Sequence, residues 1–247
     1  MTTANALDQV RLLDVQALDT RLRQLAHKRR TLPETARLAE LDAERAALRD
    51  RLVQARTVVG DVERELRTAA ADVEQVSTRA ARDRARLEAG TGSAKDLQGL
   101  QHELESLGRR QSELEDVELE VMERLEKAQG EVAGLERALA AAEEQAGDVA
   151  AAQETALAEI AAEVQQVTAQ RDDVAGGLDP ALVALYDRIR EQTQGVGAAM
   201  LRGKRCEGCR MELTPVELAR IAKLPPDDVV RCEECRTILV RTTESGL

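Results

Sequence analysis

The stretch Ala89-Gly-Thr-Gly-Ser-Ala-Lys-Asp96 decides the fold, because it interrupts two long helical patterns of similar length. It contains two glycines and two small hydroxyl residues, a combination that favours a turn. On each side, residues recur at alternating steps of four and three, which is the spacing of a coiled-coil seam. One seam runs from Leu38 to Leu87, and the other runs from Leu97 to Val149 with a gap between Leu114 and Leu125. We therefore expect one antiparallel helical hairpin that turns near residues 89–96.

The composition favours a long coiled coil over a compact globular domain. Charged residues make up 33% of the 247 residues, and Tyr186 is the only aromatic side chain. A globular core of this size normally uses aromatic residues for its largest buried areas. The Ala-, Leu-, Glu- and Arg-rich chain therefore predicts helices that pack along a narrow seam.

Two further breaks divide the helical part of the chain. Thr31-Leu-Pro-Glu34 contains a proline and the spacing of a capping box, so we expect a kink near residues 31–34. Gly176-Gly177 ends the second arm, and Asp179-Pro180 has the residues of a helix start. The segment after it predicts a connecting helix in which Tyr186 is a packing residue.

Two C-x-x-C pairs carry the strongest chemical signal. Cys206-Glu-Gly-Cys209 and Cys232-Glu-Glu-Cys235 are separated by 22 residues. Each pair can direct two thiolates at one centre, and two pairs complete a tetrahedron around zinc. The competing interpretations are a redox-active C-x-x-C, which needs only one pair, and four unrelated thiols. We expect Cys206, Cys209, Cys232 and Cys235 to bind one structural Zn²⁺ per chain, coordinatively closed and without catalytic chemistry.

These signals together predict a mainly α protein, with a long antiparallel coiled-coil hairpin followed by a small C-terminal zinc ribbon. The hairpin would occupy residues 1–176, the connecting helix 177–197 and the ribbon 198–247. In the ribbon, short strands are expected at 199–205, 229–231 and 238–241. Thr214-Pro-Val-Glu217 should cap a short helix between them.

Charge limits the classes of partner. A net charge of −11 argues against a surface that binds nucleic acid throughout. A local basic patch surrounds the first metal turn, formed by Arg202, Lys204, Arg205 and Arg210, and it could contact phosphate or a partner. No apolar run reaches membrane length, and the N-terminus lacks the features of a signal peptide. We expect a cytoplasmic protein that does not associate with membranes.

Basic clusters in the arms have two interpretations. The run Arg21, Arg23, Lys28, Arg29 and Arg30 would face Glu154, Glu159 and Glu163 across the hairpin, and Arg79, Arg82, Arg84 and Arg86 would lie near Glu103, Glu105 and Asp96. Solvated cross-hairpin ion pairs are the simpler interpretation, and a nucleic-acid patch is the alternative.

Catalysis is not expected. His27 and His102 stand alone in helical arms, with no nucleophile at a useful spacing. We therefore predict a non-enzymatic scaffold or adaptor without a small-molecule substrate, which binds proteins through its coiled coil and ribbon. The alternative is a nucleic-acid-binding or transcription-associated protein that uses the basic patch of the ribbon.

The whole chain resembles a family of bacterial proteins with a long helical hairpin and a C4-type zinc ribbon, once catalogued as a domain of unknown function. The resemblance rests on three stretches and on the first cysteine pair. The stretches are Ser93-Ala-Lys-Asp-Leu-Gln-Gly-Leu-Gln-His-Glu-Leu-Glu105, Leu182-Val-Ala-Leu-Tyr-Asp-Arg-Ile-Arg190 and Cys232-Glu-Glu-Cys-Arg-Thr-Ile-Leu239. The Ala- and Arg-rich composition is similar to that of actinobacterial members. Similar proteins of flagellated and chlamydial bacteria are associated with export-substrate chaperoning, a flagellar sigma factor and RNA. In the family pattern Gly-Arg usually follows the last cysteine, whereas this chain has Arg236-Thr237.

Overall fold

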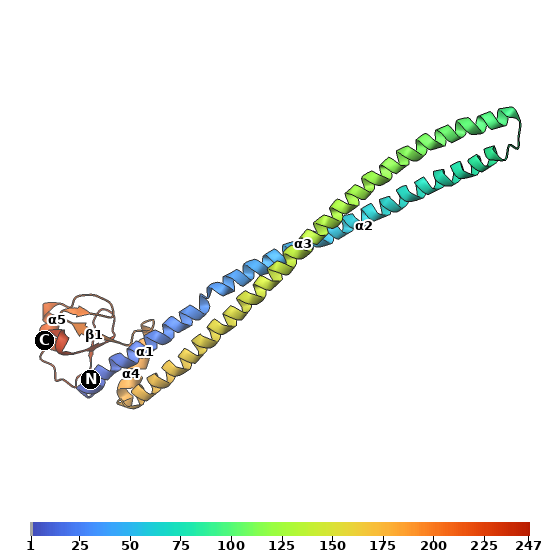
Figure 1. Ribbon diagram of the computed structural model, residues 1–247. Coiled ribbons are helices and arrows are strands. Elements are labelled where there is room, and N and C mark those ends of the chain that lie inside the picture. Colours follow the sequence, from blue (N-terminus) through green and yellow to red (C-terminus); the bar gives the residue numbers. More distant parts are fainter. Residues whose placement is uncertain (1) are drawn as a thin grey trace. The chain divides into compact units, whose positions relative to one another are not determined.

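The computed structural model describes residues 2–247, and most of them are helical. Helix α1 spans Ala6–Arg30, α2 spans Pro33–Glu88, α3 spans Ala94–Gly176 and α4 spans Pro180–Gln192 (Figure 1). The strands are β1 (Ala198–Arg202), β2 (Arg205–Cys206), β3 (Val230–Arg231) and β4 (Ile238–Val240). Helix α5 (Pro215–Ile221) lies between β2 and β3, and the 3-10 helix η1 (Thr243–Ser245) follows β4. The predicted fold class, a helical hairpin followed by a small region of strands and a short helix, is confirmed.

The turn of the hairpin joins α2 to α3 through residues 89–93. Gly90 and Gly92 have φ angles of 63° and 144°, which residues other than glycine rarely adopt. Ser93 and Asp96 then cap α3 reciprocally: the Ser93 Oγ accepts the Asp96 N–H (3.3 Å), and the Asp96 carboxylate accepts the Ser93 N–H (2.9 Å). These two features reverse the chain and start the next helix.

The chain forms two compact units, of which one is Ala36–Ala150. In this unit the buried residues of α2 all lie on the predicted seam: Leu41, Leu48, Leu52, Ala55, Val62, Ala69, Ala80 and Asp83. The buried partners on α3 are Leu114, Val121, Leu135, Ala142 and Ala146. Val121 lies in the gap that the sequence pattern left between Leu114 and Leu125. Each helix therefore buries only a narrow stripe, and the alanines in it add little buried apolar area.

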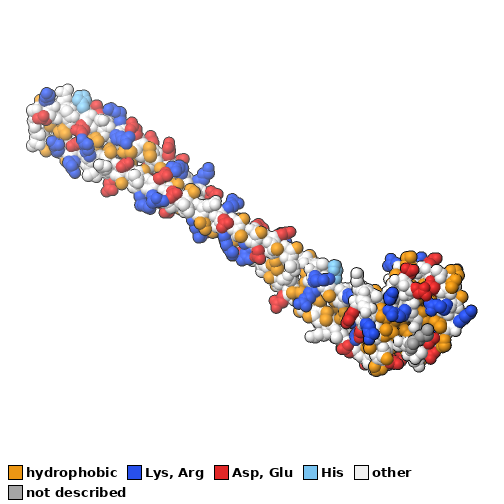
Figure 2. Space-filling model, turned by 180° about the vertical axis from the view of Figure 1, so that it is seen from behind, with side chains coloured by type: hydrophobic (Ala, Val, Ile, Leu, Met, Phe, Trp, Pro, Cys, Tyr) orange, Lys and Arg blue, Asp and Glu red, His pale blue; other side chains and the backbone are white. Residues whose placement is uncertain are grey.

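Ion pairs join the two helices outside this seam. Arg49 pairs with Glu143 and Arg56 with Glu136, each at 2.8 Å. Arg79 pairs with Glu103, as expected. Figure 2 shows Lys and Arg interspersed with Asp and Glu on the exposed faces of the helices. Because these pairs are solvent-exposed, each contributes little to stability.

The expected cross-hairpin pairing was only partly right. Arg82 and Arg84 form no ion pair within residues 2–247, and Arg86 contacts Asp83 of its own helix (3.7 Å). Of the basic run on α1, only Arg21 pairs across the hairpin within the part of the chain that the structure describes, with Glu163 (2.5 Å). A register estimated from sequence places helices side by side, but it does not determine which faces their long side chains share.

The break between α1 and α2 differs from the predicted capping box. The Thr31 N–H donates to the His27 carbonyl (3.0 Å), and the Thr31 hydroxyl donates to the same carbonyl (3.0 Å). Thr31 therefore completes the last turn of α1 and does not cap the next helix with Glu34. Pro33 instead provides the first residue of α2, where a missing N–H has no cost.

The second unit comprises the chain up to Thr35 and Ala151–Leu247, and it includes a four-stranded sheet. The strand order is β2-β1-β4-β3, with β1 and β4 parallel and the other neighbours antiparallel. The strand predicted at 199–205 was wrong as one continuous element. Gly203, with φ of 56°, turns the chain between β1 and β2. The predicted capping box of Thr214 and Glu217 is present at the start of α5.

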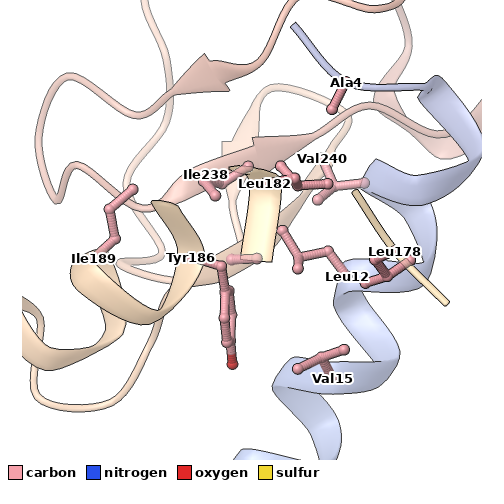
Figure 3. Close-up of a cluster of buried hydrophobic side chains, with 10 residues drawn as sticks. Ala4, Leu12, Val15, Leu178, Leu182, Tyr186, Ile189, Ile238 and Val240 are labelled. Atoms are coloured by element: carbon pink, nitrogen blue, oxygen red, sulfur yellow. The ribbon is translucent and has the colours of Figure 1, made fainter. Parts of the chain in front are cut away.

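One hydrophobic cluster joins the strands to the base of the hairpin (Figure 3). It combines Leu12 and Val15 of α1 with Tyr186 of α4 and Ile238 and Val240 of β4, and each of these side chains is 0% exposed. Gly197 lies so close that a Cβ added there would be 2.5 Å from ring carbons of Tyr186. The sheet and the hairpin base therefore share one core.

No helix within residues 2–247 combines the length and the apolar character needed to cross a lipid bilayer.

Candidate metal centre and its junction with the hairpin

The two C-x-x-C turns lie at the ends of short strands. Cys206 ends β2, and Cys232 follows β3 directly. Each turn is closed by a backbone hydrogen bond: the Arg210 N–H donates to the Cys206 carbonyl (2.7 Å), and the Arg236 N–H donates to the Cys232 carbonyl (3.0 Å). The two turns therefore have equivalent backbone geometry.

Arginine occupies the same position in both turns. Arg210 and Arg236 have φ angles of 62° and 64°, in the left-handed region that favours glycine. The departure from the family pattern at Arg236 therefore leaves the shape of the turn unchanged. An arginine at this position differs from a glycine in its conformational strain, which is on the order of 1 kcal/mol for each non-glycine residue with such a φ angle.

The four thiols form one compact cluster. The Sγ atoms of Cys206 and Cys235 are 3.8 Å apart, and those of Cys209 and Cys232 are 3.9 Å apart. All four sulfurs lie within 4.8 Å of one another. A tetrahedron with Zn–S bonds of about 2.3 Å has sulfur–sulfur edges of about 3.8 Å. The donor set and its dimensions therefore fit one structural zinc ion.

The surroundings of the thiols differ among the cysteines. Burial raises the pKa of the Cys206 thiol, and it raises the pKa of the Cys232 thiol to about 12. Burial also acts to raise the pKa of Cys235, but hydrogen bonds from Thr237, together with weaker ones from Cys232 and Cys209, hold the pKa below its ordinary value. The Thr237 hydroxyl is 2.9 Å from Cys235 Sγ, and Thr237 is buried. Thr237 can therefore support a thiolate at Cys235 from outside the cluster.

The four basic residues predicted around the first metal turn are all exposed. Arg202 donates to the Glu244 carboxylate (2.9 Å), so its charge is balanced locally. Lys204 lies in the turn between β1 and β2, Arg205 is on β2, and Arg210 follows Cys209. These three have no ion-pair partner among residues 2–247. Because Arg202 is paired with Glu244, the patch of unbalanced positive charge is smaller than the sequence indicated.

Two glutamines of α1 join the hairpin to the ribbon. Gln16 Oε1 accepts the N–H groups of Gly197 (2.7 Å) and Ala198 (3.2 Å) at the start of β1. Gln9 Nε2 donates to the carbonyls of Pro226 (3.3 Å) and Asp227 (3.2 Å). Sequence reasoning missed both residues, because a glutamine in a helix has no local feature that distinguishes a structural contact from solvent exposure.

The N-terminal segment extends this junction. Thr3 forms an antiparallel bridge with Asp228, and the Ala4 N–H donates to the Asp227 carbonyl (2.8 Å). Arg241 holds the same loop as well, because its guanidinium donates to the carbonyls of Pro225 (2.7 Å) and Asp228 (2.8 Å). The metal-bearing part is thus bound to α1 by side-chain contacts and to the segment before α1 by backbone contacts.

A buried carboxylate lies at the centre of the hairpin base. Asp19 of α1 is 2% exposed and accepts hydrogen bonds from the Tyr186 hydroxyl (2.7 Å) and from Arg190 (3.1 Å), both on α4. Arg171 of α3 is 3.4 Å from it and also contacts Asp187 (2.6 Å). This network, formed by Asp19, Tyr186, Arg171, Arg190 and Asp187, connects three helices. The sequence predicted Tyr186 as a packing residue but gave no indication of its buried partner.

The two histidines are exposed. His27 lies in the last turn of α1, and His102 of α3 is 3.8 Å from the Glu105 carboxylate on the same helix. Neither lies in the cysteine cluster.

Two family models match the chain. The CT398-like coiled coil hairpin domain matches residues 15–194, and the C4-type zinc ribbon domain matches residues 205–239. Together they cover the hairpin, the connecting helix and the cysteine cluster.

Mycobacterial proteins are similar over almost the whole chain. The protein Rv2229c of Mycobacterium tuberculosis (strain ATCC 25618 / H37Rv) is 41% identical over 238 residues, which cover 96% of this chain and 97% of that protein. The protein ML1638 of Mycobacterium leprae (strain TN) is 34% identical, with 90% of this chain and 95% of that protein covered.

Solved structures have the same fold. A structure from Mycobacterium smegmatis has a TM-score of 0.81 and 35% identity, covering 97% of this chain and 100% of that chain. CT398 from Chlamydia trachomatis has a TM-score of 0.63 and 18% identity, covering 95% of this chain and 98% of that chain. At that lower identity the likeness concerns the fold alone.

Proposed function

The chain belongs to the CT398-like coiled-coil hairpin family, and from that premise we propose that it is a non-enzymatic scaffold that binds other proteins. The observation that carries the proposal is the amount of helical surface left free. In Ala36–Ala150 each helix buries a single stripe, while large apolar side chains outside the seam, such as Val53 (64% exposed) and Leu119 (58% exposed), face solvent. Such faces suit helix-to-helix contacts with a partner.

Zinc has a structural role in this proposal. We assign Cys206, Cys209, Cys232 and Cys235 as its four ligands, and a closed set of four thiolates leaves no position for a reacting water. The metal would stabilise a small module that has little apolar area of its own. Cysteines stay reduced, and so remain able to bind a metal, in a reducing compartment; we therefore propose that the protein is cytoplasmic.

Affinity capture of the tagged full-length chain from its native host tests the proposal. The full chain is required because the ribbon and the hairpin base share a core, so isolated pieces would expose it. We expect one or more proteins to be enriched over a tag-only control, and to remain enriched after nuclease treatment. Loss of all enrichment after nuclease treatment would favour nucleic acid as the ligand.

Nucleic-acid binding by the ribbon is the second candidate. It is favoured by Lys204, Arg205 and Arg210, which are exposed and lack a carboxylate partner among the described residues. Phosphate contacts release counterions, so such binding must weaken steeply with salt. Titration of the protein with RNA and with duplex DNA at several salt concentrations tests this candidate. An absence of binding at low salt would eliminate it.

A further inference from the structure

A groove lies between α1 and α3 at the hairpin base, with a volume of about 820 Å³. Its floor is apolar and is formed by Leu22 and Ala26 of α1 and by Ile160 and Val164 of α3. Leu22 and Val164 are half-buried and Ala26 is exposed, whereas Ile160 is only 3% exposed. The helices therefore close the seam beneath the groove but leave apolar surface uncovered along it.

The two edges of the groove differ in charge. The edge on α1 carries Arg23, Arg29 and Arg30, whereas the edge on α3 carries the neutral Thr168. Arg29 and Arg30 have no ion-pair partner among residues 2–247. By contrast, Arg21 on the same helix has a partner, because it pairs with Glu163 (2.5 Å). In a chain of net charge −11, this edge is a local excess of positive charge beside an apolar floor.

The spacing of the lining residues indicates the shape of the occupant. On α3 they recur every four residues from Ile160 to Thr168, and on α1 they extend from Leu22 to Arg30. Each stripe is eight residue steps long, or about 12 Å along a helix. Two parallel stripes of this kind accept about two turns of a third helix, whose apolar side chains recur at i, i+3 or i+4, and i+7.

We propose that this groove docks an acidic amphipathic helix of a partner protein. The apolar side of the partner helix covers Leu22 and Val164, and its Asp and Glu residues line the edge that faces Arg29 and Arg30. A nucleic acid would leave the apolar floor without a complementary surface. The proposal rests on the proposed scaffold function and specifies the chemistry of its partner.

Site-specific crosslinking tests the proposal in the full-length chain. A photoreactive amino acid replaces Ala26 in the groove, and separate variants carry it at Ala47 on α2 and at Lys204 in the ribbon. The crosslinked peptides from the native host are sequenced. We expect the Ala26 position to capture a segment of another protein that has acidic residues along one side of an apolar helical stripe.

Charge reversal then tests the basic edge. The double variant R29E/R30E should lower the yield of this crosslink on the order of tenfold, and the difference should shrink at high salt. R109E/R110E is the matched control, because Arg109 and Arg110 are also adjacent and exposed on a helix but lie far along α3 from the groove. It should leave the yield unchanged. Equal helical content of both variants by circular dichroism excludes unfolding as the cause.

The outcomes separate the two proposals. Capture of this chain itself, of nucleic acid, or of a segment without an acidic amphipathic pattern at Ala26 would overturn the groove inference. Protein capture at Ala47 or Lys204 with none at Ala26 would also overturn it, while the scaffold function would stand. No protein captured at any position would overturn both.

Discussion

The Tyr186 hydroxyl on α4 donates a hydrogen bond of 2.7 Å to the buried carboxylate of Asp19 on α1, 167 residues away in the chain. Tyr186 also packs in the cluster shared by the hairpin base and the strands. A single side chain thus connects the polar network of the helices to the apolar core beneath the ribbon. The stability of the junction should therefore depend on this pair.

Replacing Asp19 with alanine should lower the free energy of unfolding by about 3 kcal/mol, because Arg171 and Arg190 would lose a buried counter-charge and Tyr186 its acceptor. Urea denaturation followed by the near-ultraviolet signal of Tyr186 measures the loss. Asp14→Ala is the control, since Asp14 is exposed on the same helix. Equal effects of the two substitutions would contradict a special role for Asp19.

The protein should lose stability above about pH 10. Burial and the contact with Asp19 raise the pKa of Tyr186 well above its ordinary value. The folded chain therefore keeps the phenol proton at a pH where the unfolded chain, with a pKa near 10, releases it. The stabilisation is complete below that pH and is lost as pH rises.

Absorbance of tyrosinate measures this effect without interference, because Tyr186 is the only aromatic residue. We expect the phenol to ionise together with unfolding, and Tyr186→Phe to flatten the alkaline decline. Ionisation near pH 10 in a chain that remains folded would show the prediction to be wrong.

Removal of zinc should disturb the hairpin base as well as the ribbon. Strands β1 and β4 contribute Ala198, Ile238 and Val240 to the core that contains Tyr186. After chelation, or in Cys232→Ser, we expect the near-ultraviolet signal of Tyr186 to decrease while most of the helical signal remains. Zinc should restore the chelated protein and magnesium should not, because thiolates favour the softer ion. An unchanged Tyr186 signal in protein shown to be metal-free would contradict this coupling.

Arg236→Gly should stabilise the second metal turn by roughly 0.5–1 kcal/mol, because glycine adopts the φ of 64° without strain. Competition with a zinc chelator, or thermal unfolding of the zinc-loaded chain, measures the gain. Arg205→Gly is the matched control: Arg205 is an exposed arginine in strand β2, where glycine should be neutral or unfavourable. The strain argument fails if the two variants change in the same direction.

The heptad spacing of the sequence was sufficient to predict the hairpin, because a coiled coil is specified by local periodicity. Leu41, Leu48 and Leu52 could be identified as buried from their spacing, and Gly90 and Gly92 marked the turn. The cysteine spacing likewise predicted the four ligands, since each C-x-x-C turn can direct two sulfurs at one centre. The short sulfur–sulfur distances of 3.8 and 3.9 Å, however, join one turn to the other.

Local patterns were less reliable where two interpretations shared the same residues. Thr31 and Glu34 have the spacing of a capping box, but the Thr31 hydroxyl completes the preceding helix instead. Gly203 divides a strand that the apolar pattern had shown as continuous. In both places the choice depended on neighbours that the local sequence does not name.

The sequence by itself therefore determined the helical hairpin, its turn and the cysteine set, because each follows from spacing within a short stretch of chain. Only the tertiary structure decided how Gln9 and Gln16 join the hairpin to the ribbon and how Asp19 joins α1 to α3 and α4. It also decided why Arg29 and Arg30 lack an ion-pair partner among the described residues when Arg21 has one. A polar side chain gains or lacks its partner through packing between residues more than a hundred positions apart, and that distance leaves no periodic trace in the chain.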